Sequence, residues 1–266
     1  MKRPHPEWIT PEWNAPGEVH AFVTTRAGGC SGGPWSGLNL GIRSGDRPQD
    51  VARNRAILRE SLPDMPRWLR QVHGWAVVDA GSGPWPDGQE PEADASFTLE
   101  PGVVCTVLVA DCMPVFLCDS GGSAVAVAHA GWRGLAGGVL EATVRAMGVP
   151  PHRLLAWLGP AIGPRHFEVG EDVVEAFAAN DAGAAGGFRP YPGRDGKWLC
   201  DLPWLARRRL ADAGVGAVSG GQHCTVSDAR LYSHRRDRGV SGRMAAVIWR
   251  ESRPVASDAP GIVRTA

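Results

Sequence analysis

The sequence lacks an excess of charge of either sign, because 28 Lys and Arg residues balance 28 Asp and Glu residues. A general nucleic-acid binder carries a strong basic excess, and a protein held at a membrane surface carries a polybasic segment. No apolar run reaches the roughly 18 residues that a membrane span needs. The polar segment from Met1 to Pro16 also lacks the apolar core of a signal peptide. We therefore expect a cytoplasmic protein that binds neither nucleic acid nor membranes.

The cysteines form no C-x-x-C pair, which excludes a zinc ribbon and a thioredoxin motif. The glycine-rich segment 26–34 fits neither the dinucleotide-fold pattern nor the P-loop pattern. In the cytoplasm a reduced cysteine is core filler, a metal ligand or a nucleophile. We expect core filler for all but one of them, namely for Cys30, Cys105, Cys118, Cys200 and Cys224.

Continuous apolar runs dominate the centre of the chain and predict strands covered on both faces, because half-exposed strands alternate apolar and polar residues. These runs occupy residues 103–109, 115–118, 124–128 and 154–158. Further strands are expected at 19–25, 68–73, 75–79 and 244–249, and helices at 48–60, 134–147, 170–179 and 202–213. The mixture favours one α/β (α+β) domain of layered sheets and helices, at residues 19–250, between an N-terminal arm (1–18) and a loose tail (251–266).

Three short segments carry residues suited to chemistry: His73, Cys112 and His129. The last two lie where a predicted apolar strand runs out, and strand ends are where clefts gather in layered α/β proteins. Imidazole and thiolate are good zinc ligands, and three protein ligands leave the fourth tetrahedral position open for a water of lowered pKa. Cys112 as nucleophile with His129 as base is a second interpretation. The spacing does not show that the three residues meet.

Several arginines stand beside turns and are candidates for holding an oxyanion or phosphate. Arg133 precedes the predicted helix 134–147, Arg26 opens the glycine-rich segment, and Arg235 and Arg236 lie in a Ser-His-Arg-Arg-Asp run. The commoner role of a single arginine is a solvated surface ion pair.

Taken together, these segments resemble the YfiH/laccase-domain family, described as multicopper polyphenol oxidase and as purine nucleoside phosphorylase-like. The resemblance rests on motifs in order between about residues 26 and 249: QVHG at 71–74, ADCMPV at 110–115, HAGWRG at 129–134, GPAIGP at 159–164, FEVG at 167–170, CT at 224–225, YSHRRD at 232–237 and GRM at 242–244.

The resemblance implies a layered α/β sandwich, related to cysteine-hydrolase-like deamidase toxins, with Zn²⁺ held by His73, Cys112 and His129. It implies phosphorolysis of adenosine and inosine to a free base and ribose 1-phosphate. It also implies S-methyl-5′-thioadenosine phosphorylase and adenosine deaminase activities. The partners would be nucleosides and phosphate, with Arg26, Arg133, Arg235 or Arg236 as phosphate clamps, in a monomer or homodimer.

Copper-dependent phenol oxidation is the other activity that the resemblance implies, and the histidine content argues against it. A four-copper oxidase needs many histidines in H-x-H pairs, whereas this chain has 8 His and no such pair. A copper polyphenol oxidase (laccase), a metal-free Cys-His hydrolase and a non-enzymatic metal- or nucleotide-binding module remain the alternatives to the phosphorylase.

Overall fold

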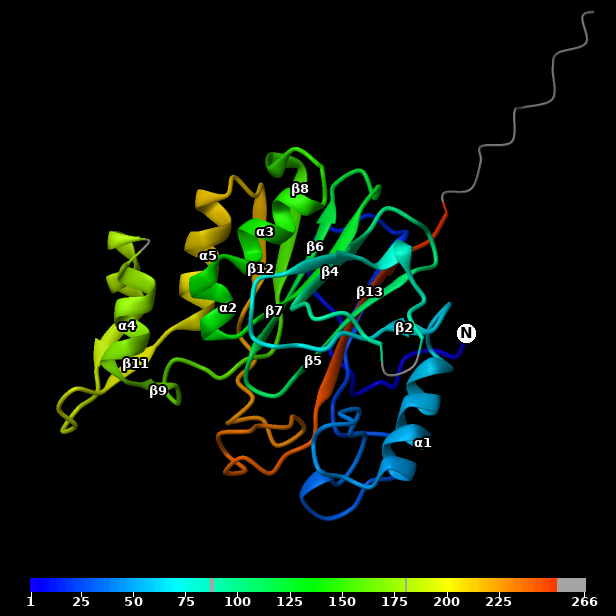
Figure 1. The fold of residues 1–266 in the computed structure, drawn as a ribbon, viewed down its shortest axis with the longest axis horizontal. Coiled ribbons are helices and arrows are strands. Elements are labelled where there is room, and N and C mark those ends of the chain that lie inside the picture. Colours follow the sequence, from blue (N-terminus) through cyan, green and yellow to red (C-terminus); the bar gives the residue numbers. More distant parts are fainter. Residues whose placement is uncertain (87–88, 180, 253–266) are drawn as a thin grey trace, which may run out of the picture.

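Two mixed β-sheets packed face to face form the centre of the molecule (Figure 1). The computed structural model describes residues 1–86, 89–179 and 181–252. The four-stranded sheet has the order β1 (Val19–Val23), β13 (Met244–Arg250), β5 (Val104–Val109) and β2 (Pro66–Arg67). The six-stranded sheet has the order β12 (Ala217–Gly220), β8 (Leu154–Leu158), β6 (Met113–Asp119), β7 (Val125–Ala130), β4 (Ala95–Thr98) and β3 (Val77–Asp79).

Residues of β6 alternate between two separate cores. Phe116 and Cys118 face the four-stranded sheet, and Phe116 stacks on Trp157 of β8 with ring centroids 5.7 Å apart. Val115 and Leu117 face the opposite way, into the core beneath the helices. β6 is buried on both faces and is apolar from Met113 to Cys118, which confirms the prediction from the continuous apolar runs.

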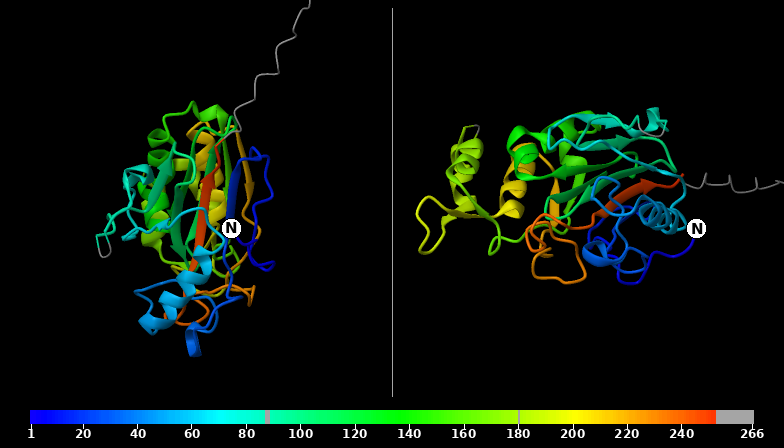
Figure 2. Two further views of the ribbon diagram at one scale, coloured as in Figure 1. Left: turned by 90° about the vertical axis from the view of Figure 1, so that its right-hand side faces the viewer. Right: turned by 60° about the horizontal axis from the view of Figure 1, so that its bottom comes forward.

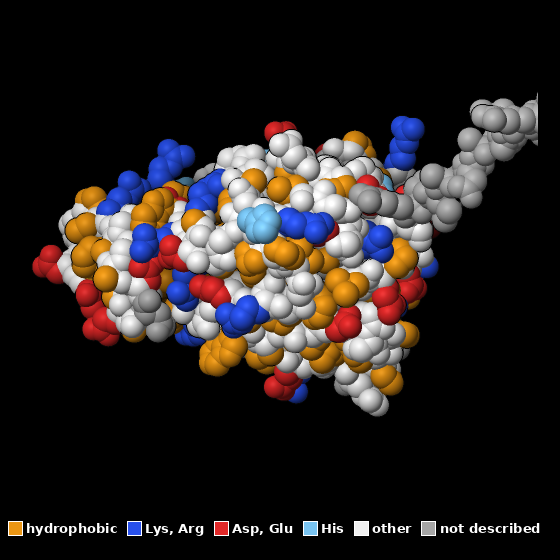
Figure 3. Space-filling view, turned by 90° about the horizontal axis from the view of Figure 1, so that it is seen from above, with side chains coloured by type: hydrophobic (Ala, Val, Ile, Leu, Met, Phe, Trp, Pro, Cys, Tyr) orange, Lys and Arg blue, Asp and Glu red, His pale blue; other side chains and the backbone are white. Residues whose placement is uncertain are grey.

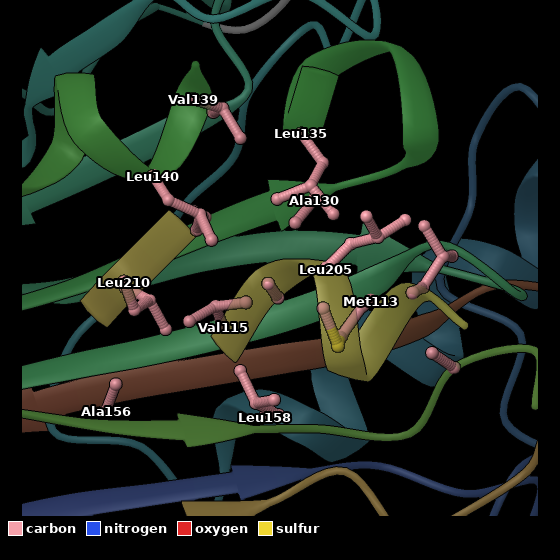
Figure 4. Close-up of a cluster of buried hydrophobic side chains, with 14 of the residues drawn as sticks. Met113, Val115, Ala130, Leu135, Val139, Leu140, Ala156, Leu158, Leu205 and Leu210 are labelled. Carbon is pink, nitrogen blue, oxygen red and sulfur yellow. The ribbon is translucent and has the colours of Figure 1, made fainter. Parts of the chain in front are cut away.

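Helices cover the outer face of the six-stranded sheet. α2 (Trp132–Gly137), α3 (Val139–Ala146) and α5 (Leu202–Asp212) place apolar side chains against β6, β7 and β8. Figure 4 shows side chains of this core from both the helices and the sheet, including Leu135, Leu140, Leu205, Leu210, Met113, Val115 and Leu158. The result is the layered α/β fold that the sequence predicts.

The outer face of the four-stranded sheet is covered by α1 (Pro48–Arg59) and the loops beside it. Leu58 of α1 packs in one cluster with Phe22, Val247 and Trp249. A third sheet, of β9 (Glu168–Val169), β10 (Phe188–Pro190) and β11 (Trp198–Cys200), lies with α4 (Glu171–Ala178) beyond the helices, at the left of Figure 1. Short 3-10 turns occupy Gly33–Trp35, Ala80–Ser82, Pro151–Arg153 and Ala182–Gly187.

The structure corrects three predictions of secondary structure. The helix expected at 134–147 is two helices, α2 and α3, because Gly138 between them has φ +95° and cannot continue either one. The strand expected at 68–73 is absent: the nearest strand, β2, ends at Arg67, and within 68–73 only Arg70 forms an isolated bridge, to Glu92. Five short strands were not predicted, namely β4, β9, β10, β11 and β12, because their few, mixed residues carry no periodic signal. Most of the predicted tail lies outside the described residues.

Two features of the described residues bear on the expectations for membrane spans and for surface charge. No helix there is long and apolar enough to cross a membrane. On the face seen in Figure 3, Lys and Arg side chains are interspersed with Asp and Glu. Such a mixture of signs is typical of a globular protein surface.

Candidate active site

A cavity of about 530 Å³ opens where β5 and β6 meet loops from distant parts of the chain. His73, Cys112 and His129 all line it. His73 comes from the loop before β3, Cys112 from the turn between β5 and β6, and His129 from β7. Figures 1 and 2 show the loops around residues 26–47 and 223–243 side by side at one end of the molecule. Strand pairing thus brings together residues that are far apart in the sequence.

The two histidines and Cys112 form a compact group of metal-binding atoms. One ligand atom from each residue lies within 4.8 Å of the others. The ring centroids of His73 and His129 are 4.9 Å apart, and the two imidazole rings meet edge to face. Among the described residues this is the one such group of His, Cys, Asp or Glu that could hold a metal ion. The donors are two nitrogens and one sulfur, a set that suits zinc.

Gly131 allows the thiol of Cys112 to approach the backbone of the neighbouring strand. β6 and β7 pair with Met113 opposite Ala130, so Cys112 lies opposite Gly131. A Cβ atom at position 131 would lie 2.7 Å from the Cys112 sulfur and 3.5 Å from the His73 ring. Any side chain at this position would therefore displace the thiol.

Two residues of the site have backbones in the left-handed region, which is unfavourable for side chains other than glycine. His73 has φ +61° and Asp111, next to Cys112, has φ +87°. Both oxygens of the Asp111 carboxylate accept hydrogen bonds, one from the Thr225 hydroxyl and the other from the Arg235 backbone N–H. These contacts hold Cys112 in place against the unfavourable backbone conformation.

Asp94 connects the two histidines, and sequence reasoning missed it. Its buried carboxylate accepts hydrogen bonds from the backbone N–H groups of Val72, His73 and Gly74. It also lies 2.8 Å from Nδ1 of His129. Asp94 directly precedes β4, and β4 pairs with β7, which explains why the carboxylate meets His129. The only sequence signal is an acid between two alanines, which by itself predicts nothing.

The charges of this group stabilise each other. Burial alone would raise the pKa of the Cys112 thiol, but the charge and hydrogen bonds of His129 and His73 lower it to about 6. Burial alone would lower the pKa of His129, but the Cys112 thiolate and Asp94 raise it to about 9. The Asp94 carboxylate thus fixes the proton on Nδ1, so Nε2 of His129 is the nitrogen left for a metal or for Cys112.

The predicted arginines divide into two pairs. Arg133 and Arg235 line the cavity. Arg26 and Arg236 do not, and both bind Asp237: Arg26 Nη2 lies 3.3 Å and Arg236 Nε lies 2.9 Å from its carboxylate oxygens. In this structure Arg26 and Arg236 are occupied by the Asp237 carboxylate. Their role as phosphate clamps stays a prediction.

The remaining cysteines do not all match the expectation of core filler. Cys105, Cys118 and Cys200 are buried, and burial raises the pKa of each thiol. Cys30 is exposed, so the prediction is wrong for this residue. Cys224 is half-buried, and its sulfur accepts a hydrogen bond from the Gly163 backbone N–H.

Known proteins similar to this chain share most of its length. Purine nucleoside phosphorylase PA4543 of Pseudomonas aeruginosa is 51% identical over 243 residues, which cover 91% of this chain and 98% of that protein. Purine nucleoside phosphorylase YfiH of Escherichia coli is 48% identical, with 91% and 98% covered. The crystal structure of Neisseria meningitidis protein NMB0706 superposes with a TM-score of 0.87 at 48% identity, covering 92% of this chain and 99% of that one.

A family model places the chain in the same group. Residues 20–251 match the model of the family described as multi-copper polyphenol oxidoreductase laccase. This match covers most of the chain, and the similar proteins above cover 91–92% of it. The chain belongs to this laccase-like family, whose relatives include proteins named YfiH and purine nucleoside phosphorylase.

Proposed function

We propose that this protein is a zinc-dependent purine nucleoside phosphorylase whose metal ligands are His73, Cys112 and His129. The observation that carries the proposal is the His–Cys–His group in the wall of a cavity of about 530 Å³, in a chain 51% identical to a named purine nucleoside phosphorylase. A cavity of this volume is large enough for a small-molecule ligand such as a nucleoside.

The residues present fit a zinc ion. Zinc is commonly bound by neutral imidazole and thiolate, and the lowered pKa of Cys112 means that its sulfur is ionised near neutral pH. The Asp94 carboxylate binds Nδ1 of His129, and a carboxylate at this position is a usual outer partner of a histidine that ligates a metal. When bound with three protein ligands, zinc supplies a Lewis acid with one open position.

Phosphorolysis needs the cavity to hold a nucleoside and a phosphate together. A phosphate oxygen forms a bond to C1′ of the ribose while the bond from C1′ to the purine N9 breaks. The electron pair goes to the purine, which takes the proton released by phosphate, so the products are the free base and ribose 1-phosphate. Trp132 offers a ring for the purine, and Arg133 and Arg235 add positive charge to the cavity wall for the anion.

Two related activities belong to the same proposal. Cleavage of S-methyl-5′-thioadenosine breaks the same glycosidic bond and needs only that the cavity accept a thioether at C5′. Hydrolytic deamination of adenosine adds water at C6 and releases ammonia, a reaction suited to a metal site with an open position.

A metal-free cysteine hydrolase is the second candidate, and one arrangement favours it. Cys112, His129 and Asp94 form a chain of nucleophile, base and orienting carboxylate. The mutual pKa changes of Cys112 and His129 are those of a thiolate–imidazolium pair. The two candidates share the same residues and differ in whether a metal replaces the proton between them.

Incubation of the purified protein with adenosine, with and without phosphate, tests the proposal. We expect adenine and ribose 1-phosphate only when phosphate is present, and near-stoichiometric zinc that is lost in Cys112→Ala. Cys30→Ala, which removes an exposed thiol, should keep both zinc and activity. Active protein without metal would reject the zinc-dependent mechanism, and adenosine left unchanged in both incubations would reject the nucleoside reaction.

A further inference from the structure

Arg243 is held at the edge of the cavity by a loop from the other end of the chain. Its backbone N–H donates to the Asn39 side-chain oxygen at 2.8 Å, and its carbonyl accepts from the Leu40 N–H at 3.1 Å. The Asn39 oxygen also accepts from the Gly41 N–H at 3.1 Å. Arg243 lies directly before β13, so this loop and the sheet fix its backbone from both sides.

The Arg243 side chain is positioned by close packing. A Cβ atom at Gly41 would lie only 2.7 Å from Cγ of Arg243, so the glycine leaves room for the arginine stem. Nη1 donates to the carbonyl oxygens of Ser241 and Gly242 at 2.8 and 3.0 Å. Within the described residues Arg243 forms no ion pair with a carboxylate, and neither Nε nor Nη2 has a hydrogen-bond partner in the protein.

The cavity around this guanidinium is strongly cationic. Arg43, Arg133, Arg235 and Arg243 line it, and Asp111 is the single carboxylate among the described lining residues. Both oxygens of Asp111 are already occupied, by Thr225 and by the Arg235 backbone. Of the other cations, Arg43 pairs with Glu90 and the Arg235 guanidinium donates to the Glu168 carbonyl.

Arg243 is half-buried, so its guanidinium has lost part of its hydration, and a bound anion would offset that loss. Arg243 lines the same cavity as Cys112 and Asp111. Burial lowers the pKa of Arg243, and the charges of Cys112 and Asp111 oppose this effect. A planar guanidinium with free N–H groups binds a phosphate through two parallel hydrogen bonds. Free N–H groups and a fixed backbone thus coincide in Arg243, which lines the same cavity as Cys112.

We propose that Arg243 binds the inorganic phosphate co-substrate in the cavity beside Cys112, with Asn39 and Gly41 as positioning residues. This inference rests on the proposed phosphorylase function and names the residue that holds its second substrate. A phosphate dianion could also be the 5′-phosphate of a nucleotide, and the experiment must separate these two sources. Free phosphate is the better match, because Arg243 lines the same cavity as the three proposed zinc ligands, where the proposed reaction would take place.

Steady-state kinetics of Arg243→Gln and Arg243→Lys test the inference. We expect Arg243→Gln to raise the KM for phosphate by about 10- to 100-fold, the loss typical of a charge-assisted hydrogen bond, with the KM for adenosine changed less than about threefold. The KM for phosphate of Arg243→Lys should lie between those of the unmodified protein and Arg243→Gln, because lysine keeps the positive charge but lacks the planar guanidinium. Arg53→Gln, on the exposed side of α1, is the matched control and should match the unmodified protein.

Thermal stabilisation by phosphate without nucleoside gives a readout independent of turnover. Phosphate, compared with chloride at equal ionic strength, should raise the melting temperature of the unmodified protein and of Arg53→Gln, but not of Arg243→Gln. The zinc content should be the same in all of these proteins. If Arg243→Gln does not fold, the graded loss in Arg243→Lys serves as the test.

The outcomes separate the inference from the proposed function. Phosphate-dependent cleavage with an unchanged phosphate KM in both variants would overturn the role of Arg243 and leave the phosphorylase standing. Phosphate stabilisation that depends on Arg243, in a protein that never cleaves adenosine, would leave the anion site standing and reject the phosphorylase. A higher KM for adenosine 5′-monophosphate alone would overturn the inference in favour of a nucleotide site.

Discussion

Asp94 is the residue on which both histidines of the site depend. Its carboxylate holds the loop that carries His73 through three backbone N–H groups, and it orients His129 through Nδ1. It is completely buried, so no water can replace it if its charge is removed. One side chain therefore sets the orientation of one ligand and the backbone position of the other.

Asp94→Asn should lower zinc affinity by about 10- to 100-fold, the usual effect of losing the outer partner of a histidine ligand. An amide offers one acceptor oxygen in place of two, so it cannot serve both the loop and His129. Competition against a chelator measures the affinity, and circular dichroism checks that the variant is folded.

Asp79→Asn is the matched control, because Asp79, the exposed last residue of β3, accepts a similar hydrogen bond from the Gly81 backbone N–H. Its zinc affinity should equal that of the unmodified protein. Equal affinity in Asp94→Asn as well would contradict the positioning role of Asp94.

At the scale of elements, Gly138 divides the helical segment that follows β7. With φ +95° and ψ +28°, it ends α2 and begins α3 in a left-handed conformation. The break turns the chain so that Leu135 of α2 and Leu140 of α3 both reach the same core. A continuous helix would keep one fixed spacing of its apolar face and could not follow this change of direction.

Gly138→Ala should lower the free energy of unfolding by about 1–2 kcal/mol, because a Cβ atom disfavours the left-handed conformation. The nearest atom to that Cβ would be 3.6 Å away, in Glu141, so the cost is one of conformation and not of space. Urea denaturation measures the change.

Gly17→Ala is the control, because Gly17 has open space around its Cβ position and no positive φ. Its effect should stay within about 0.5 kcal/mol. Similar losses in the two variants would mean that the backbone conformation at Gly138 does not determine the effect.

Among the strands, those buried on both faces could be predicted from the sequence, and most of the short strands could not. The apolar runs 103–109 and 124–128 predict β5 and β7 well, because burial on both faces leaves a local signal. β4 was missed because Ala95–Thr98 mixes small and polar residues, and its burial comes from tertiary neighbours: β7 and β3 beside it in the sheet, and α3 and β5 packed against it. Its absence from the prediction also concealed the role of Asp94, which precedes it.

At the scale of the whole molecule, Asp237 joins segments from the two ends of the chain. Its carboxylate accepts from Arg26, which follows β1, and from Arg236 and Ser241 in the loop before β13. Partial burial alone would raise the pKa of Asp237, but the hydrogen bond and charge of Arg236, with the charge of Arg26, hold it below its ordinary value of 3.8. The ionised carboxylate thus stabilises the closed arrangement of these loops.

The sign of the pH dependence follows from that lowered pKa. Asp237 contributes stability above the unfolded value of 3.8, and this contribution disappears as the pH falls from there through the lower folded pKa. Asp237→Asn should therefore lower the free energy of unfolding by about 1–2 kcal/mol at pH 7. The difference from the unmodified protein should shrink as the pH falls below 3.8.

Denaturant titrations from pH 7 to acid conditions measure this difference. Asp195→Asn, in an exposed turn, is the control and should follow the unmodified protein throughout. A difference for Asp237→Asn that stays constant with pH would show that the ion pairs with Arg236 and Arg26 do not cause it.

The sequence by itself determined which segments become buried strands, and it singled out His73, Cys112 and His129 as candidates for one metal. Both conclusions depend on local properties: an apolar run signals burial, and a side chain's chemistry is the same wherever it lies. Only the tertiary structure decided that the three residues meet, that Asp94 supports them, and that Arg243 faces the cavity while Arg26 and Arg236 bind Asp237. These contacts join residues far apart in the chain, and their distances are set by strand pairing and loop packing, which no local pattern encodes.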